Sequence, residues 1–185
     1  MILRFRFITF IFLLAIAPLG CAITNKEAVL NEGEHMLVRK LDAVLLAADD
    51  LPTMEVDGTV NHRKRGIVNQ PPVADGFIQS WNGTQPEEHI TVHYWLLRSI
   101  VDAQTAAEEW RSFITSQGIY QHEPNPEHVV GDGTWRIEND ASIWFVKNNV
   151  LVHIVARRPL LNQLPLTRSV ARKIEAKINA ALNQQ

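Results

Sequence analysis

Residues 143–154 constrain the fold of this chain more than any other stretch. They form two runs of β-branched and aromatic residues separated by Asn148-Asn149. Asparagine tolerates the positive φ that a two-residue hairpin turn requires at its central positions, so the pattern predicts a tight β-hairpin. A turn at this place pairs Phe145 with Val152 and puts both side chains on one face of the sheet.

The turn before this hairpin sets the register of a further strand. A three-residue loop at 139–141 places Ile137 opposite Ile143, whereas a two-residue loop places Arg136 there. A single inward face requires apolar residues in register, which favours the three-residue loop. Residues 134–156 are therefore predicted to form a three-stranded meander.

A separate strand is predicted earlier in the chain, at residues 89–97. Apolar and polar side chains alternate there as on a half-buried strand. The predicted core face consists of Ile90, Val92, Tyr94 and Leu96. Residues 53–88 are rich in glycine and proline, and their pattern predicts an irregular connection with two short strands at 53–56 and 76–81.

Three amphipathic helices are predicted from apolar residues at three- and four-residue spacing. The first runs from Thr24, which opens a capping box with Glu27, to about Ala48. The second begins at Asp102 and ends near Gly118, and the third covers residues 165–182. The order of these elements predicts an α+β fold with an antiparallel sheet and the helices packed on one of its faces. Residues 22–185 are expected to be one domain.

The first 21 residues have the pattern of an export signal. Arg4 and Arg6 precede an apolar run at 7–17, which is too short to span a bilayer. Residues 18–21, Pro-Leu-Gly-Cys, resemble a bacterial lipobox, and this resemblance implies lipidation of Cys21 and an anchor in the outer membrane. The alternatives are cleavage after Ala22, which gives a soluble periplasmic protein, and an uncleaved anchor.

Cys21 is the only cysteine of the chain, so no internal disulfide is available and the fold depends on packing. The net charge of −2 argues against a nucleic-acid partner.

Residues 89–182 resemble small exported bacterial domains without an assigned activity. The resemblance rests on the strand, the helix rich in Ala and Trp, the turn Val130-Gly131-Asp132, the Asn-Asn hairpin and the closing helix. The same region is loosely similar to the sheet-and-helix sandwich of the PsbP proteins. That likeness implies binding or assembly of other proteins and carries over no functional residue.

The seven histidines raise the question of a metal site. His89 and His93 share a strand face, but four strand residues separate their backbones by roughly 13 Å, which is too far for one ion. His122 and His128 flank a loop with two glutamates that could converge on zinc, and a solvated loop is the favoured alternative. No metal or other cofactor is therefore predicted.

The candidate binding surface is apolar. Trp144, Val146 and Leu151 point away from the predicted core face of the hairpin, His153 lies opposite Trp144, and Trp81 is a further exposed candidate. Either a helix of the same chain or an external partner has to cover such a surface. The sequence thus predicts a non-catalytic binding or assembly module of the cell envelope, whose partner is an envelope protein or a glycan. The alternative is a small exported hydrolase or metal-dependent enzyme, although no serine lies in a G-x-S-x-G motif.

Overall fold

The computed structural model describes residues 36–61, 73–84, 88–115, 121–122, 125–137, 141–156 and 163–184. The described strands are β1 (Met54–Asn61), β2 (Val73–Gly83), β3 (His89–Leu97), β4 (Gln121–His122), β5 (Gly133–Ile137), β6 (Ser142–Lys147) and β7 (Val150–Ala156). The described helices are η2 (Leu41–Ala43), η3 (Ala48–Asp50), α2 (Ile100–Thr115), η4 (Pro126–His128) and α3 (Gln163–Asn183). The mixed α+β class predicted from the sequence is confirmed.

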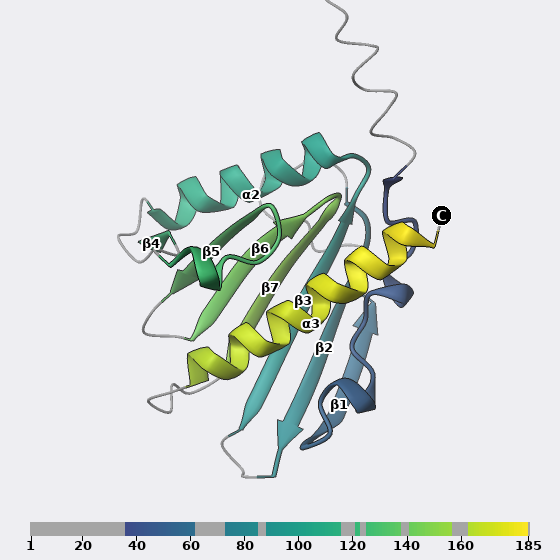
Figure 1. Cartoon of the computed structure of the whole chain (residues 1–185), viewed down its shortest axis with the longest axis vertical. Helices are drawn as coiled ribbons and strands as arrows, with labels where there is room; N and C mark the ends of the chain where they lie inside the picture. The colour runs from purple at the N-terminus through teal and green to yellow at the C-terminus, as the bar shows by residue number, and fades with distance from the viewer. Residues whose placement is uncertain are drawn as a thin grey trace, which may run out of the picture.

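The strands form one antiparallel sheet in the order β1-β2-β3-β7-β6-β5-β4. β3 and β7 meet near the middle of the sheet, and helix α3 crosses in front of it in Figure 1. Consecutive strands pair on each side of this junction, so most of the sheet consists of local hairpins. The junction between β3 and β7 joins the two halves across the sequence.

The two long helices pack on opposite faces of the sheet, which corrects the expectation that the helices share one face. The core on the α3 side contains Phe145, Val152 and the helix residue Ile174. The core on the α2 side contains Trp144 and the helix residue Ala106. Neighbouring residues of a strand point to opposite faces, so strands β3, β6 and β7 supply side chains to both cores.

The two hairpins of the meander region had different outcomes. Phe145 pairs with Val152, as predicted, and Asn148 has a φ of 54°. In contrast, Arg136 pairs with Ile143. The prediction had placed Ile137 opposite Ile143, on the assumption that the sheet has a single apolar face. The argument failed because both faces of β6 are covered.

The prediction of a long first helix up to about Ala48 is wrong for the part of it that the structure describes. Residues 37–40 are not helical, and only short 3₁₀ turns follow, η2 and η3. Leu41 and Val44, two of the apolar residues whose spacing predicted the helix, are nevertheless buried. A single 3₁₀ turn that lies on the sheet is enough to place them in the core.

Later elements lie closer to the predictions. β3 spans the predicted residues. α3 starts at Gln163, and Ile174 and Ile178 are fully buried. α2 starts two residues before Asp102, because the Ser99 hydroxyl accepts a hydrogen bond from the Asp102 N–H and caps the helix.

The connection at 53–88 contains longer strands than predicted. β1 extends to Asn61 and β2 covers Val73–Gly83, with a register shift in β1 between Val56 and Gly58. A bulge of this kind lets a glycine-containing strand remain paired.

Some predictions lie outside the described residues, among them the export signal, Cys21, the capping box at Thr24 and the helix end at Gly118. No helix in the described part of the chain has the length and hydropathy needed to cross a membrane.

Two buried side-chain amides attach the segment before β1 to the sheet. The Val38 N–H donates to Asn149 Oδ1 at 2.9 Å, and Asn149 Nδ2 donates to the Val38 carbonyl at 3.0 Å. Gln79 binds the N–H and carbonyl of Leu46 in the same way, each at 3.0 Å. Each amide thus replaces a neighbouring strand's backbone, which fixes this irregular segment on the α3 side of the sheet.

Candidate functional site

The apolar surface predicted from the sequence is not exposed. The exposed fractions of Trp144, Val146 and Leu151 are 3%, 3% and 0%, and that of Trp81 is 0%. The first three lie in the core between the sheet and α2, whereas Trp81 lies in the core on the α3 side. The chain's own helix α2 covers the face that holds Trp144, Val146 and Leu151, and the core on the α3 side encloses Trp81.

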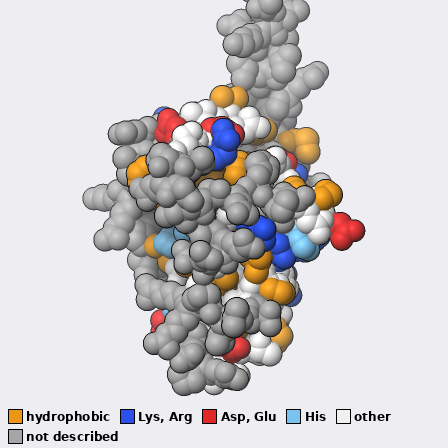
Figure 2. All heavy atoms as spheres, turned by 90° about the vertical axis from the view of Figure 1, so that its left-hand side faces the viewer, with side chains coloured by type: hydrophobic (Ala, Val, Ile, Leu, Met, Phe, Trp, Pro, Cys, Tyr) orange, Lys and Arg blue, Asp and Glu red, His pale blue; other side chains and the backbone are white. Residues whose placement is uncertain are grey.

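Figure 2 views the left-hand side of the molecule in Figure 1, and its coloured hydrophobic side chains lie in small groups between charged and histidine side chains. The large hydrophobic side chains that are exposed include Val101 and Phe113 of α2, at 56% and 53%. They lie on the helix rather than on the meander.

His153 is the predicted surface residue that remains accessible. It is half-buried on the α2 side of β7, directly opposite the half-buried His93 of β3. Thr91 and His89 continue the same face along β3, two and four residues before His93. We call His89, Thr91, His93 and His153 the histidine face.

The two central rings of the histidine face are stacked on each other and on tryptophans. The ring centres of His93 and His153 are 5.5 Å apart, with an angle of 24° between the ring planes. His153 stacks on Trp144 with the ring centres 3.8 Å apart, and His93 stacks on Trp95 at 5.6 Å. Trp110 of α2 packs against Trp144, with the ring centres 4.4 Å apart. The tryptophans therefore hold both imidazoles in place from the covered half of the face.

Burial determines the charge of His153. Desolvation, together with the neighbouring His93, lowers the pKa of His153 well below its ordinary value of 6.5. The imidazole of His153 is therefore neutral at pH 7 and keeps a nitrogen lone pair.

His153 also makes a contact that the sequence reasoning did not identify. Its Nε2 lies 2.7 Å from the hydroxyl oxygen of Ser142. The signal was present in the predicted hairpin, because the pairing of Trp144 with His153 makes Ser142 a diagonal neighbour on the same face. Ser142 itself is only 2% exposed.

A second hydrogen-bonded group forms the outer end of the histidine face. His89 Nδ1 lies 2.8 Å from Asn82 Oδ1, and His89 Nε2 lies 3.1 Å from Thr91 Oγ1. A carbonyl oxygen can only accept, so Nδ1 carries the proton and Nε2 accepts from the threonine hydroxyl. Both nitrogens of His89 are therefore occupied.

The predicted zinc loop is described only in part. His128 is half-buried in η4, and the side chain of His122 lies outside the described residues. Among the described residues, no group of three or more His, Cys, Asp or Glu side chains could hold a metal ion.

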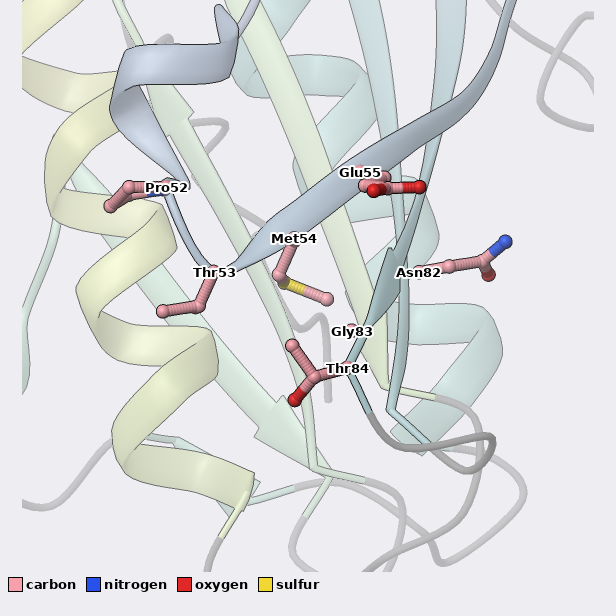
Figure 3. Close-up of a pocket in the computed structure, with 7 residues that line it drawn as sticks. All are labelled: Pro52, Thr53, Met54, Glu55, Asn82, Gly83 and Thr84. Atoms are coloured by element: carbon pink, nitrogen blue, oxygen red, sulfur yellow. The ribbon is translucent and has the colours of Figure 1, made fainter.

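A pocket of about 370 Å³ lies where β1 starts and β2 ends. Its lining consists of Pro52, Thr53, Met54, Glu55, Asn82, Gly83 and Thr84. In Figure 3 the side chains of Glu55 and Asn82 extend away from those of Met54 and Thr84, so the polar groups do not converge on one point. The pocket offers a shallow polar recess rather than a reaction centre.

Comparisons with known proteins give no family. No family model matches the chain, and no curated protein matches it. Among solved structures, the chain is similar to the extracellular domain of PknH from Mycobacterium tuberculosis, with 15% sequence identity and a TM-score of 0.40. The match covers 82% of this chain and 97% of that chain. A likeness of this extent is too weak to assign a fold family or a function.

Proposed function

We propose that the chain is a non-catalytic binding module of the cell envelope, exported through its N-terminal segment and anchored through Cys21. The proposed export and anchoring rest on the basic, apolar and lipobox-like residues at 1–21. The binding role rests on one structural observation: the sheet face under α2 ends in the half-buried pair His93 and His153. Covered faces stabilise a fold, whereas partly open polar positions on rigid strands are suited to ligands.

The binding region differs from the one that the sequence predicted. Trp144 supports the site from beneath by stacking on His153, and it does not present a surface of its own. The ligand is therefore expected to contact the half-buried imidazoles rather than a tryptophan face. This favours a polar ligand or a polar group on an envelope partner.

The anchor is tested by intact mass and membrane fractionation of the native protein beside Cys21→Ser, with Ala22→Ser as the matched control. We expect the native and control proteins to start at Cys21, carry a diacylglycerol-sized addition and sediment with membranes. Cys21→Ser should lose both properties. An unmodified native protein that is cut after residue 22 would contradict the anchor.

A hydrolase remains the second candidate because Ser142 Oγ and His153 Nε2 are 2.7 Å apart, the distance of a nucleophile from its base. The burial of Ser142 argues against attack on a substrate. A fluorophosphonate probe, which labels activated serines, distinguishes the two functions. We expect no labelling of the native protein, and labelling that disappears in Ser142→Ala would favour the hydrolase.

A further inference from the structure

We propose that the outer edge of β1 binds an extended segment of a partner protein that is rich in lysine or arginine and adds a strand to the sheet. We call this edge, with its side chains Glu55 and Asp57, the acidic edge. It is a second surface of the molecule, and the inference does not depend on the histidine face.

The two ends of the sheet differ in length. β1 has eight residues, whereas β4 at the other end has two. In the described part of the chain, no strand pairs with the outer side of β1. Every second residue of such an edge strand directs its backbone N–H and C=O groups outward, where an added strand can bind them. β1 is therefore long enough to serve as a template for another strand, and β4 is not.

The side chains along β1 leave its edge accessible. Glu55, Val56, Asp57 and Thr59 are exposed, and the exposed fraction of Val56 is 48%. A Cβ added at Gly58 would meet no atom within 4 Å. A strand laid along this side of β1 therefore has room beside the described residues.

The two faces of β1 differ in chemistry, which fixes the pattern of the partner. Val56 pairs with Trp81, which belongs to the core on the α3 side, so Val56 and Met54 face that side. Glu55 pairs with Asn82 and faces the opposite side. Side chains of an added strand alternate between the faces in the same way. The partner residues beside Val56 should be apolar, and those beside Glu55 should be basic.

Charge also decides between a partner protein and a second copy of this chain. A second copy would bring its own Glu55 and Asp57 against the same two carboxylates, and like charges on neighbouring strands are destabilising. Acidic side chains and a bulge, such as the register shift between Val56 and Gly58, are features that keep edge strands from pairing with each other. Lysine or arginine on the added strand instead gains cross-strand ion pairs. The acidic edge therefore favours a basic partner.

The pocket at the start of β1 provides a place for one side chain of the partner. Its volume is about 370 Å³, and residues 52–55 and 82–84 line it. In Figure 3 the Glu55 side chain extends away from those of Met54 and Thr84. Partners that add a strand gain affinity from backbone hydrogen bonds and specificity from pockets that hold alternate side chains. The pocket should thus hold a side chain from the partner face that lies beside Val56.

The test measures the fluorescence anisotropy of a labelled synthetic peptide during titration with the purified full-length protein. Lysine and valine alternate in this peptide, which has the same length as β1. We expect saturable binding of one peptide per chain. Two matched peptides should not bind: one has glutamate in place of lysine, and the other is N-methylated on its backbone amides and so lacks the strand's donors.

Glu55→Lys reverses the charge of the acidic edge. It should weaken binding of the lysine peptide about tenfold or more and create binding of the glutamate peptide. Glu109→Lys is the matched control, because Glu109 is an exposed carboxylate on α2 and the substitution changes the net charge equally. New binding of the glutamate peptide cannot come from a variant that fails to fold, so it reports on the reversed contact itself.

Hydrogen–deuterium exchange locates the bound lysine peptide, and protection should appear in β1 and not in β4. Protection elsewhere than β1, equal binding of the lysine and glutamate peptides, or a dimer of the native protein whose formation protects β1 would overturn the inference. A protein that sediments with membranes but does not bind the lysine peptide would refute this inference and leave the envelope role in place.

Discussion

The side-chain amide of Asn149 pairs with both backbone groups of Val38, a residue 111 positions away in the sequence. The same Nδ2 group also donates to the Leu97 carbonyl at 3.0 Å, and Asn149 is only 2% exposed. A single buried amide thus joins the entering segment, the end of β3 and the β6–β7 turn. Such a group is costly to remove because its partners stay buried.

Asn149→Ala should lower the free energy of unfolding by about 2–4 kcal/mol, since it leaves the N–H of Val38 and two carbonyls without a partner. Urea denaturation measures the loss. Asn148→Gly is the matched control in the same turn, because Asn148 has a φ of 54° that glycine adopts without strain. A loss under about 1 kcal/mol for Asn149→Ala would contradict the assigned role.

Gly131→Ala should destabilise the protein by about 1–3 kcal/mol, because an L-residue is strained at positive φ. Gly131 has a φ of +69°, and a Cβ there would lie 2.3 Å from the Val146 carbonyl oxygen. Gly58→Ala is the matched control, since nothing lies within 4 Å of its added Cβ. Thermal unfolding of the two variants gives the comparison, and equal midpoints would refute the predicted clash.

The pair Asp50–Lys177 should contribute stability that acid removes. Burial acts to raise the pKa of Asp50, but the Ala47 N–H, Lys177 and Lys173 outweigh it, so the net pKa lies below 3.8. The folded state therefore holds its proton less tightly than the unfolded state. The stabilisation is complete above the unfolded pKa and disappears as the pH falls through the folded pKa.

This pH dependence is measured by urea denaturation of the native protein, Asp50→Asn, Lys177→Met and the double variant between pH 7 and pH 3. The ion pair is 2.9 Å long and partly exposed. A coupling energy of about 0.2–1 kcal/mol is expected at pH 7, because solvent screens such a pair. Coupling that persists undiminished at pH 3 would show that the carboxylate charge is not its source.

Acrylamide should quench only a minor part of the tryptophan emission. Trp81, Trp95, Trp135 and Trp144 are at most 9% exposed, whereas Trp110 is half-buried on α2. Trp110→Phe should remove most of the quenchable fraction, and Trp144→Phe is the matched control that should leave it. The reverse result would mean that the meander face is open and would restore the surface predicted from the sequence.

The elements that were predicted well are those whose apolar residues recur at the regular spacing of a strand or of a helix. β3 and the β6–β7 hairpin follow from alternation and a turn at Asn148, and α3 follows from apolar residues every four positions. The predicted β5–β6 register was wrong because it assumed that only one face of the sheet is buried. Both faces of β6 are covered, so the apolar residues of that strand do not select one register. Arg136 could therefore stand opposite Ile143.

The site was predictable only in part. The pairing of Trp144 with His153 followed from the hairpin, and Ser142 could have been added from the same register. The position of His93 beside His153 depends on the pairing of β3 with β7. A long-range pairing of this kind leaves no local pattern in either strand. The amides of Gln79 and Asn149 were likewise unforeseeable, because they bind distant backbone.

The two hydrogen bonds between Asn149 and Val38 also affect how the domain would respond to a mechanical load. Asn149 stands between β6 and β7 and bonds Leu97 at the end of β3, so a pull on the entering segment reaches the middle of the sheet. The edge strand β1 comes later in the chain and lies at the margin of the sheet, next to β2. A tether attached before Val38 would therefore strain the central hydrogen bonds together, rather than open the sheet strand by strand from its margin.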